Sequence, residues 1–114
     1  MSEYFDLTRI EELQTVLGAD TQKILGSMLA SMTQAIERAQ RAVAAGELDV
    51  ATGSAHRARN DALMLGADQL QTALTELEAA TRDDDAARAA AALERLREVW
   101  APTRDELASI ARPQ

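Results

Sequence analysis

The sequence predicts an all-α protein, an antiparallel four-helix bundle with a short N-terminal helix that caps one end of it. Apolar residues make up 46% of the 114 residues but aromatic residues only 3%, so the core must consist of aliphatic side chains and many alanines. Alanine and leucine favour helices, whereas β-branched and aromatic residues favour strands. Apolar residues also recur at intervals of three and four, the spacing of one helix face. We expect residues 1–114 to form a single domain.

Each helix is justified by its apolar period and by the residues at its ends. Asp6 is placed to cap a first helix over residues 7–17, and Gly18 ends this helix. A long second helix should follow, capped by Asp20. The inward positions are Leu7, Ile10, Leu13 and Leu17 in the first helix, and Leu25, Met28, Met32, Ala35, Ala39 and Ala42 in the second, where Ile24, Leu29, Ile36 and Val43 widen the face.

The third and fourth helices are separated by glycine as well. The third follows Gly46, carries a narrow stripe composed mostly of alanine, and ends at Gly66. Asp68 is placed to cap the fourth helix. The inward positions are Leu48, Ala51, Ala55, Ala58, Ala62 and Leu65 in the third helix, and Leu70, Leu74 and Leu77 in the fourth.

The final helix follows an acidic run at residues 83–85. This run has two interpretations, a metal-binding cluster or a helix cap with further acidic residues near the positive end of the helix, and we favour the cap. Pro102 lacks a backbone donor, so we expect a kink or break near residues 98–102. The inward positions are Ala89, Leu93, Leu96, Trp100, Thr103, Leu107 and Ile110.

The overall charge and composition exclude several classes of function. Twelve Lys and Arg against nineteen Asp and Glu give a net charge of −7, which repels nucleic acid and anionic membrane surfaces. The absence of cysteine excludes disulfides, thiolate metal sites and a thiol nucleophile. No signal peptide and no bilayer-spanning run is evident. We therefore expect a cytoplasmic protein without nucleic-acid or membrane partners.

His56 is the only histidine of the chain. At about 100° per residue it lies outside the apolar stripe of the third helix. Its flank is shared with Thr52, Gly53, Arg59 and Asn60. Helical geometry therefore argues against a core histidine and leaves two interpretations, an ordinary surface histidine or a functional one.

Three kinds of chemistry can be weighed for His56. A metal site in a helical bundle uses motifs such as Glu-x-x-His, but residue 53 is Gly and no second ligand cluster is present, so we expect no metal. A hydrolytic triad needs a sheltered pocket that a small alanine-rich bundle does not offer. An exposed neutral imidazole can itself attack a phosphoryl group, and Arg59 can supply positive charge one turn away.

Residues 55–68, AHRARNDALMLGAD, resemble the histidine-containing phosphotransfer (HPt) domain family of phosphorelays. The family motif runs roughly His-x-Leu-Lys-Gly, with Gly-Ala ten and eleven residues after the histidine. The matching residues here are His56, Ala58, Arg59 and Asn60, followed by Gly66 and Ala67. The likeness extends over nearly the whole chain, through FDLTRIEELQTVLGAD at the start, AAGELDVATGSAHRA before the histidine, and LTELEAATRDDD after it.

The resemblance implies a phosphoryl carrier on an antiparallel four-helix bundle with an exposed histidine. His56 would accept a phosphoryl group from an aspartyl phosphate on a receiver domain and pass it to another receiver. Such a domain is not an enzyme, has no ATP site and needs no cofactor, because Mg²⁺ belongs to the receiver. The implied partners are receiver domains or a hybrid histidine kinase, and we expect a monomer.

The resemblance also implies roles for the residues around His56. Arg59 and Asn60 would contact the phosphoryl group, with Arg82 as a further basic residue near the site. Gly66 and Ala67 match the structural part of the motif. The residues expected to contact a partner are Thr52, Gly53, Leu63 and Met64.

Two departures from the family pattern lead to an alternative function. Asn60 replaces a glycine that leaves room for the receiver, and Asp61 brings negative charge close to an incoming anion. On the helix, Asp61 is expected on the opposite flank from Arg59. The alternative is a degenerate HPt adaptor that binds a receiver or a kinase without becoming phosphorylated.

Overall fold

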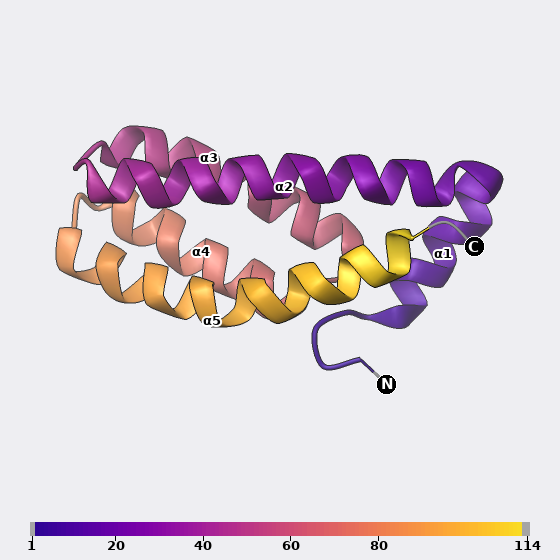
Figure 1. Cartoon of the computed structure of the whole chain (residues 1–114). Helices are drawn as coiled ribbons and strands as arrows, with labels where there is room; N and C mark the ends of the chain where they lie inside the picture. The colour runs from indigo at the N-terminus through magenta and orange to yellow at the C-terminus, as the bar shows by residue number, and fades with distance from the viewer. Residues whose placement is uncertain (1, 113–114) are drawn as a thin grey trace.

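The computed structural model describes residues 2–112, and these residues are almost entirely helical, with no strand among them (Figure 1). This architecture confirms the all-α prediction. A short 3₁₀ turn, η1, joins the first two helices. The elements are α1 (Leu7–Leu17), η1 (Gly18–Asp20), α2 (Thr21–Ala44), α3 (Leu48–Leu65), α4 (Asp68–Arg82) and α5 (Ala86–Ala111).

Four helices, α2 to α5, pack side by side into an elongated bundle of 43 × 23 × 19 Å. Each packs mainly on its neighbours in the chain, and α5 closes the bundle by packing on α2. Short turns at Gly46 and Gly66 make consecutive helices antiparallel. Figure 1 shows α1 lying across one end of the bundle, which confirms the predicted capping position.

The side chains that α3 contributes to the core are mostly small, and those of the other helices are larger. Four alanines of α3 have no exposed surface, whereas α4 and α5 contribute large leucines. The predicted stripe of α3 is therefore confirmed in its central turns. Leu7 of α1, expected to face inward, is 41% exposed, and Phe5 from the preceding segment is buried instead. The four alanines are Ala51, Ala55, Ala58 and Ala62.

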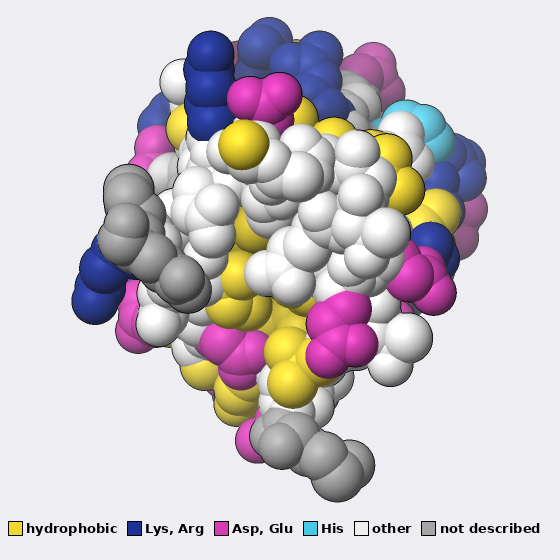
Figure 2. Space-filling view, turned by 90° about the vertical axis from the view of Figure 1, so that its right-hand side faces the viewer, with side chains coloured by type: hydrophobic (Ala, Val, Ile, Leu, Met, Phe, Trp, Pro, Cys, Tyr) yellow, Lys and Arg dark blue, Asp and Glu magenta, His cyan; other side chains and the backbone are white. Residues whose placement is uncertain are grey.

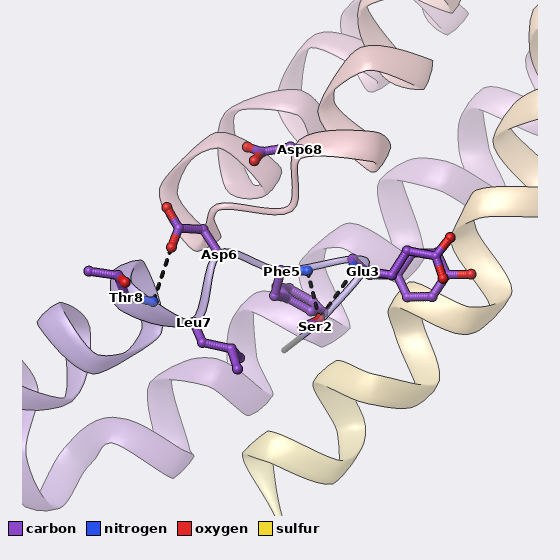
Figure 3. A pocket seen from close by; sticks show the side chains of 8 residues that line it. Ser2, Glu3, Phe5, Asp6, Leu7, Thr8 and Asp68 are labelled. Atoms are coloured by element: carbon purple, nitrogen blue, oxygen red, sulfur yellow. Dashed lines mark hydrogen bonds between the residues drawn. The ribbon is translucent and has the colours of Figure 1, made fainter.

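Two of the predicted helix caps are confirmed. The Asp6 carboxylate accepts a hydrogen bond from the Thr8 amide at 3.0 Å (Figure 3). The Asp85 carboxylate likewise accepts from the Arg88 amide at 3.0 Å, so the acidic run ends in a helix cap as we expected. Both bonds satisfy backbone donors that the first turn of a helix leaves unpaired.

Two other predicted caps make no side-chain capping bond. Asp20 is the N-cap residue of α2, as predicted, but its side chain makes no capping bond, because the chain enters α2 through η1. Within this turn, the Thr21 hydroxyl donates to the Gly18 carbonyl at 2.6 Å. Asp68 is the first residue of α4, not its cap, and can favour the helix only through its charge in the first turn.

Pro102 does not break the final helix. α5 runs without interruption through Pro102, and Figure 1 shows only bending along its length. The missing amide leaves the carbonyl of Glu98 without its donor within the helix, and Glu98 is an exposed residue. One residue further on, the buried Thr103 hydroxyl donates to the Val99 carbonyl at 2.7 Å. Of the expected kink or break, the break is therefore absent, because the lost hydrogen bond lies on the solvent side, and α5 bends instead.

The segment before α1 is fixed to the bundle by Ser2 (Figure 3). Its hydroxyl oxygen accepts from the amides of Tyr4 and Phe5 at 3.1 and 2.9 Å, and its proton is donated to the Glu106 carboxylate of α5 at 2.8 Å. An open groove of about 410 Å³ lies along residues 2–8 and Asp68. His56 is not among the residues that line it.

Gly66 joins the N-terminal segment to the turn between α3 and α4. It ends α3 with a φ of +68°, a conformation that strains residues with a side chain. Its carbonyl accepts from the Asp6 amide at 2.8 Å. A Cβ atom at this position would lie 2.9 Å from the Cβ of Asp6 and 3.1 Å from that of Arg9. Both backbone conformation and close packing therefore require glycine here.

Replacing Gly66 by alanine tests these two requirements together. We expect Gly66→Ala to lower the free energy of unfolding by roughly 2 to 4 kcal/mol, from left-handed strain and crowding. Gly46→Ala is the matched control, because Gly46 has a φ of +74° but open space where a Cβ atom would lie. It should cost only about 1 kcal/mol. Equal losses in urea unfolding would show that crowding at Gly66 contributes nothing.

Candidate functional site

His56 lies on the solvent side of α3, at the edge that faces α4. Half of its side chain is exposed, so one ring edge is open to solvent while the other is in contact with the protein. This placement confirms that the residue stays outside the apolar seam. The histidine is nevertheless not an isolated surface residue, because its Nδ1 atom lies 3.1 Å from Oε1 of Glu78 on α4.

Glu78 is the central residue of the site, although sequence reasoning did not identify it. Only 6% of its side chain is exposed. Burying a carboxylate without partners is costly, so its contacts are part of the fold as well as of the site. A signal for it existed in the sequence: Glu78 falls one residue after Leu77 and four after Leu74, beside the apolar stripe of its helix. An acidic residue at such a position requires a cation nearby.

Two arginines supply positive charge to the buried carboxylate. Arg82 donates from Nη2 to Oε2 of Glu78 at 2.6 Å, one turn along α4. Arg59 of α3 forms an ion pair in which Nε lies 3.2 Å from Oε1, although the Nε–H makes no hydrogen bond there. Arg59 and Arg82 were both predicted near the site, and the structure brings both to it through a residue that we missed.

The charge state of Glu78 follows from these contacts. Burial raises the pKa of its carboxyl group, but hydrogen bonds from His56 and Arg82, together with the charge of Arg59, outweigh that effect. The pKa consequently lies below its ordinary value of 4.5. Glu78 is therefore a carboxylate at neutral pH and offers a fixed negative charge to the imidazole.

Two possible hydrogen bonds compete for the Nδ1 atom of His56. A proton on Nδ1 can be donated to Glu78, whereas an unprotonated Nδ1 can accept from Nη2 of Arg59, which lies 2.9 Å away. One nitrogen cannot do both in the neutral ring. The first arrangement leaves the lone pair on Nε2, the second leaves it on Nδ1, and the tautomer decides which nitrogen can react.

A hydroxyl pair holds the two helices together one turn below the histidine. Oγ1 of Thr52 on α3 lies 2.7 Å from Oγ1 of Thr81 on α4. The Thr81 hydroxyl also lies within hydrogen-bonding distance of the Leu77 and Glu78 carbonyls. Thr52, which we expected to contact a partner, is therefore engaged within the bundle in this structure.

The remaining predicted residues lie on the open face of α3. Gly53 and Asn60 are exposed above and below His56 along the helix. Leu63 and Met64 are 50% and 53% exposed, an unusual exposure for large apolar side chains. Asp61 lies on the flank toward Ser31 of α2, as we expected from the helical wheel. Gly66 and the buried Ala67 form the turn into α4.

Comparison with solved structures addresses the fold. The chain is similar to the crystal structure of histidine-containing phosphotransfer protein B (HptB) from Pseudomonas aeruginosa PAO1, with a TM-score of 0.89 over 97% of this chain and 96% of that chain. The chain has the fold of a histidine-containing phosphotransfer protein. Sequence identity to HptB is 21%, so this HPt fold is shared at low similarity. Neither protein-family models nor curated proteins gave a match.

The charge on Glu78 predicts a pH-dependent contribution to stability. A lowered pKa means that the charge stabilises the fold above the ordinary value of 4.5, and that this stabilisation is lost as the pH falls through the lower folded-state pKa. We expect Glu78→Gln to lower the free energy of unfolding by about 1 to 3 kcal/mol at pH 7. The difference from the unmodified protein should shrink below pH 4.5.

Urea unfolding at a series of pH values measures this effect. Glu76→Gln is the matched control, because Glu76 lies on the same helix and is exposed. It should change stability by only a few tenths of a kcal/mol at any pH. A deficit for Glu78→Gln that stayed constant down to strongly acidic pH would mean that the carboxylate charge is not what stabilises the fold.

Proposed function

We propose that this protein is a phosphoryl carrier of a phosphorelay, in which His56 accepts a phosphoryl group from an aspartyl phosphate of a receiver domain and passes it to another receiver. The observation that carries the proposal is the half-exposed imidazole whose Nδ1 lies against the buried carboxylate of Glu78. An arrangement of this kind orients a ring and selects its tautomer, which an ordinary surface histidine does not require.

The chemical step uses the tautomer with the proton on Nδ1. This proton is donated to Glu78, because a hydrogen bond to a carboxylate is stronger than one between neutral groups. The lone pair on Nε2 attacks phosphorus, the N–P bond forms, and the P–O bond to the aspartate breaks. The aspartate leaves as a carboxylate, and the ring retains its Nδ1 proton and becomes cationic. Glu78 then stabilises that positive charge.

The arginines have a second role after the transfer. In the unphosphorylated protein Arg59 and Arg82 are both occupied by Glu78. Arg59 also lies 2.9 Å from the ring, so its guanidinium can turn toward the oxygens of a phosphoryl group on Nε2. The chain acts as a carrier and not as an enzyme, with no ATP site of its own, and Mg²⁺ is expected on the receiver only.

The exposed face of α3 is the proposed contact surface for the receiver or a hybrid histidine kinase. Leu63 and Met64 offer apolar area beyond His56, and Gly53 leaves open space on the other side of it.

Within residues 2–112, no helix combines the length and the apolar character that crossing a bilayer demands.

Phosphotransfer profiling tests the proposal directly. When the protein is mixed with the phosphorylated receivers of its organism, we expect an acid-labile phosphoprotein to form. His56→Gln should abolish this product completely while the helical content measured by circular dichroism stays unchanged. If no receiver of the organism gives a phosphohistidine, the carrier function is wrong.

The same assay tests the role of Glu78. Glu78→Gln keeps the shape of the side chain but removes the charge and the preference for a proton on Nδ1, so transfer should slow by at least about tenfold. Glu76→Gln should leave the rate unchanged.

A degenerate adaptor that binds without being phosphorylated is the second candidate. One observation favours it: the contact between Arg59 and Nδ1 is compatible with the tautomer that leaves no lone pair on Nε2. Asn60 adds a side chain on the exposed face where the family pattern has glycine. Asp61 gives this alternative less support, because it faces α2, away from the flank of His56 that meets Glu78. Receiver binding unchanged by His56→Ala, without phosphohistidine, would establish this function.

The variant Asn60→Gly tests whether the Asn60 side chain slows phosphoryl transfer or assists it. Removing an exposed side chain next to the approach path should raise the transfer rate several-fold, at a stability cost of about 1 kcal/mol for a glycine within a helix. Stopped-flow mixing with the receiver measures the rate. A slower transfer would instead assign the Asn60 amide a positive role at the phosphoryl group.

A further inference from the structure

A small polar cavity lies between α2 and α3, on the flank of α3 opposite to Glu78. Its volume is about 100 Å³. We propose that it is a binding site for one compact oxyanion, separate from the histidine site. The residues that line it are Ser31, Gln34, Ala35 and Arg38 from α2, and Ser54 and Arg57 from α3.

The lining is rich in hydrogen-bond donors and contains no carboxylate. Arg38 from α2 and Arg57 from α3 both line the cavity and are exposed, and neither forms an ion pair within residues 2–112. They differ in this from Arg59 and Arg82, which are both paired with Glu78. Two unpaired guanidinium groups with hydroxyl and amide donors match the chemistry that recognises phosphate or carboxylate oxygens.

Ser54 provides an independent observation. It is only 8% exposed, and its hydroxyl has no hydrogen-bond partner in the described part of the chain, although it lines the cavity. Hydroxyl groups within helices ordinarily bond to a carbonyl one turn earlier, as Thr52 does with Leu48 at 2.9 Å. The Ser54 hydroxyl is not a buried unsatisfied group, but a donor that lines the cavity beside two arginines and stays accessible to a ligand.

Size and surroundings limit what the cavity can hold. A volume near 100 Å³ corresponds to the space of about three water molecules at roughly 30 Å³ each, enough for one phosphate or carboxylate group but not for a nucleotide. Asp61 is the internal competitor, since it lies near Ser31 and Arg57. Burial raises the pKa of its carboxyl group, whereas a hydrogen bond with Ser31 and the charge of Arg57 act in the opposite direction.

The position of the cavity relates it to the surface beside His56. Thr52, His56 and Arg59 face α4, whereas Ser54 and Arg57 face α2, so the two sites occupy opposite edges of one exposed helix face. In Figure 2, Lys and Arg side chains gather along the upper edge of the view with some Asp and Glu among them, and the histidine lies to their right. Although the whole chain carries a net charge of −7, the two arginines that line the cavity suit it to an anion.

Titration with inorganic phosphate, followed by ¹H–¹⁵N NMR at constant ionic strength, tests the site on the unphosphorylated protein. We expect saturable shifts of the amides of residues 31–38 and 54–57. Arg57→Gln and Arg38→Gln should each weaken binding by roughly tenfold or more, because each removes charged hydrogen bonds. Arg97→Gln is the matched control, an exposed arginine of α5 outside this cavity, and it should bind phosphate as the unmodified protein does.

Shifts that do not saturate, or that weaken equally in all three variants, would overturn the proposal and show only general screening of charge. His56→Gln should bind phosphate normally, so failure of the carrier function would leave this result intact. A second arm identifies the source of the anion. If phosphate competes with a receiver for the unmodified protein but not for Arg57→Gln, the site is occupied by a carboxylate of the docked partner. If phosphate binds without competing with the receiver, the site is occupied by free phosphate.

Discussion

The close approach of α3 to its neighbours is the constraint on which the rest of the structure depends. Its central turns bury four alanines that have no exposed surface, with Ser54 as the one buried polar residue among them. Short side chains at a helix contact allow the axes to approach, because interaxial distance depends on the residues between them. Polar groups at the edges of the seam can then meet directly: the hydroxyls of Thr52 and Thr81 lie 2.7 Å apart, and His56 reaches Glu78 at 3.1 Å. Larger residues in the seam would separate these pairs.

The buried carboxylate of Glu78 connects the stability of the bundle with the chemistry of its surface. An unpaired charge at this position would oppose folding, so cationic or proton-donating groups must be present on both helices. Arg82 supplies one from the same helix, and Arg59 and His56 supply two from α3. The contact that satisfies the fold therefore also orients the imidazole. On the other edge of α3, no carboxylate lines the α2–α3 cavity, and Arg38 and Arg57 remain available.

Most of the fold was predictable from the local sequence pattern, and the predictions that the structure did not bear out share a cause. The ends of α1 and the cap at Asp85 follow from nearby residues alone. The cap at Asp68, the capping bond of Asp20 and the break at Pro102 are absent because each depends on more than the local pattern: the Ala67 turn before α4, the η1 turn before α2, and the solvent exposure of Glu98. Propensity describes which local structure a residue favours by itself, whereas its surroundings in the fold decide whether that structure forms.

By itself, the sequence determined which face of each helix is buried, and therefore that His56 lies outside the seam, with Arg59 on its flank and Asp61 on the other. A period along one chain gives this result because each residue turns the helix by a fixed angle. Only the tertiary structure decided that Glu78, 22 residues away, meets His56, and that Arg38 and Arg57 line the same cavity. Such pairs depend on how far one helix is shifted along its neighbour. The packing of the whole bundle sets this shift, and the apolar period of a single helix carries no information about it.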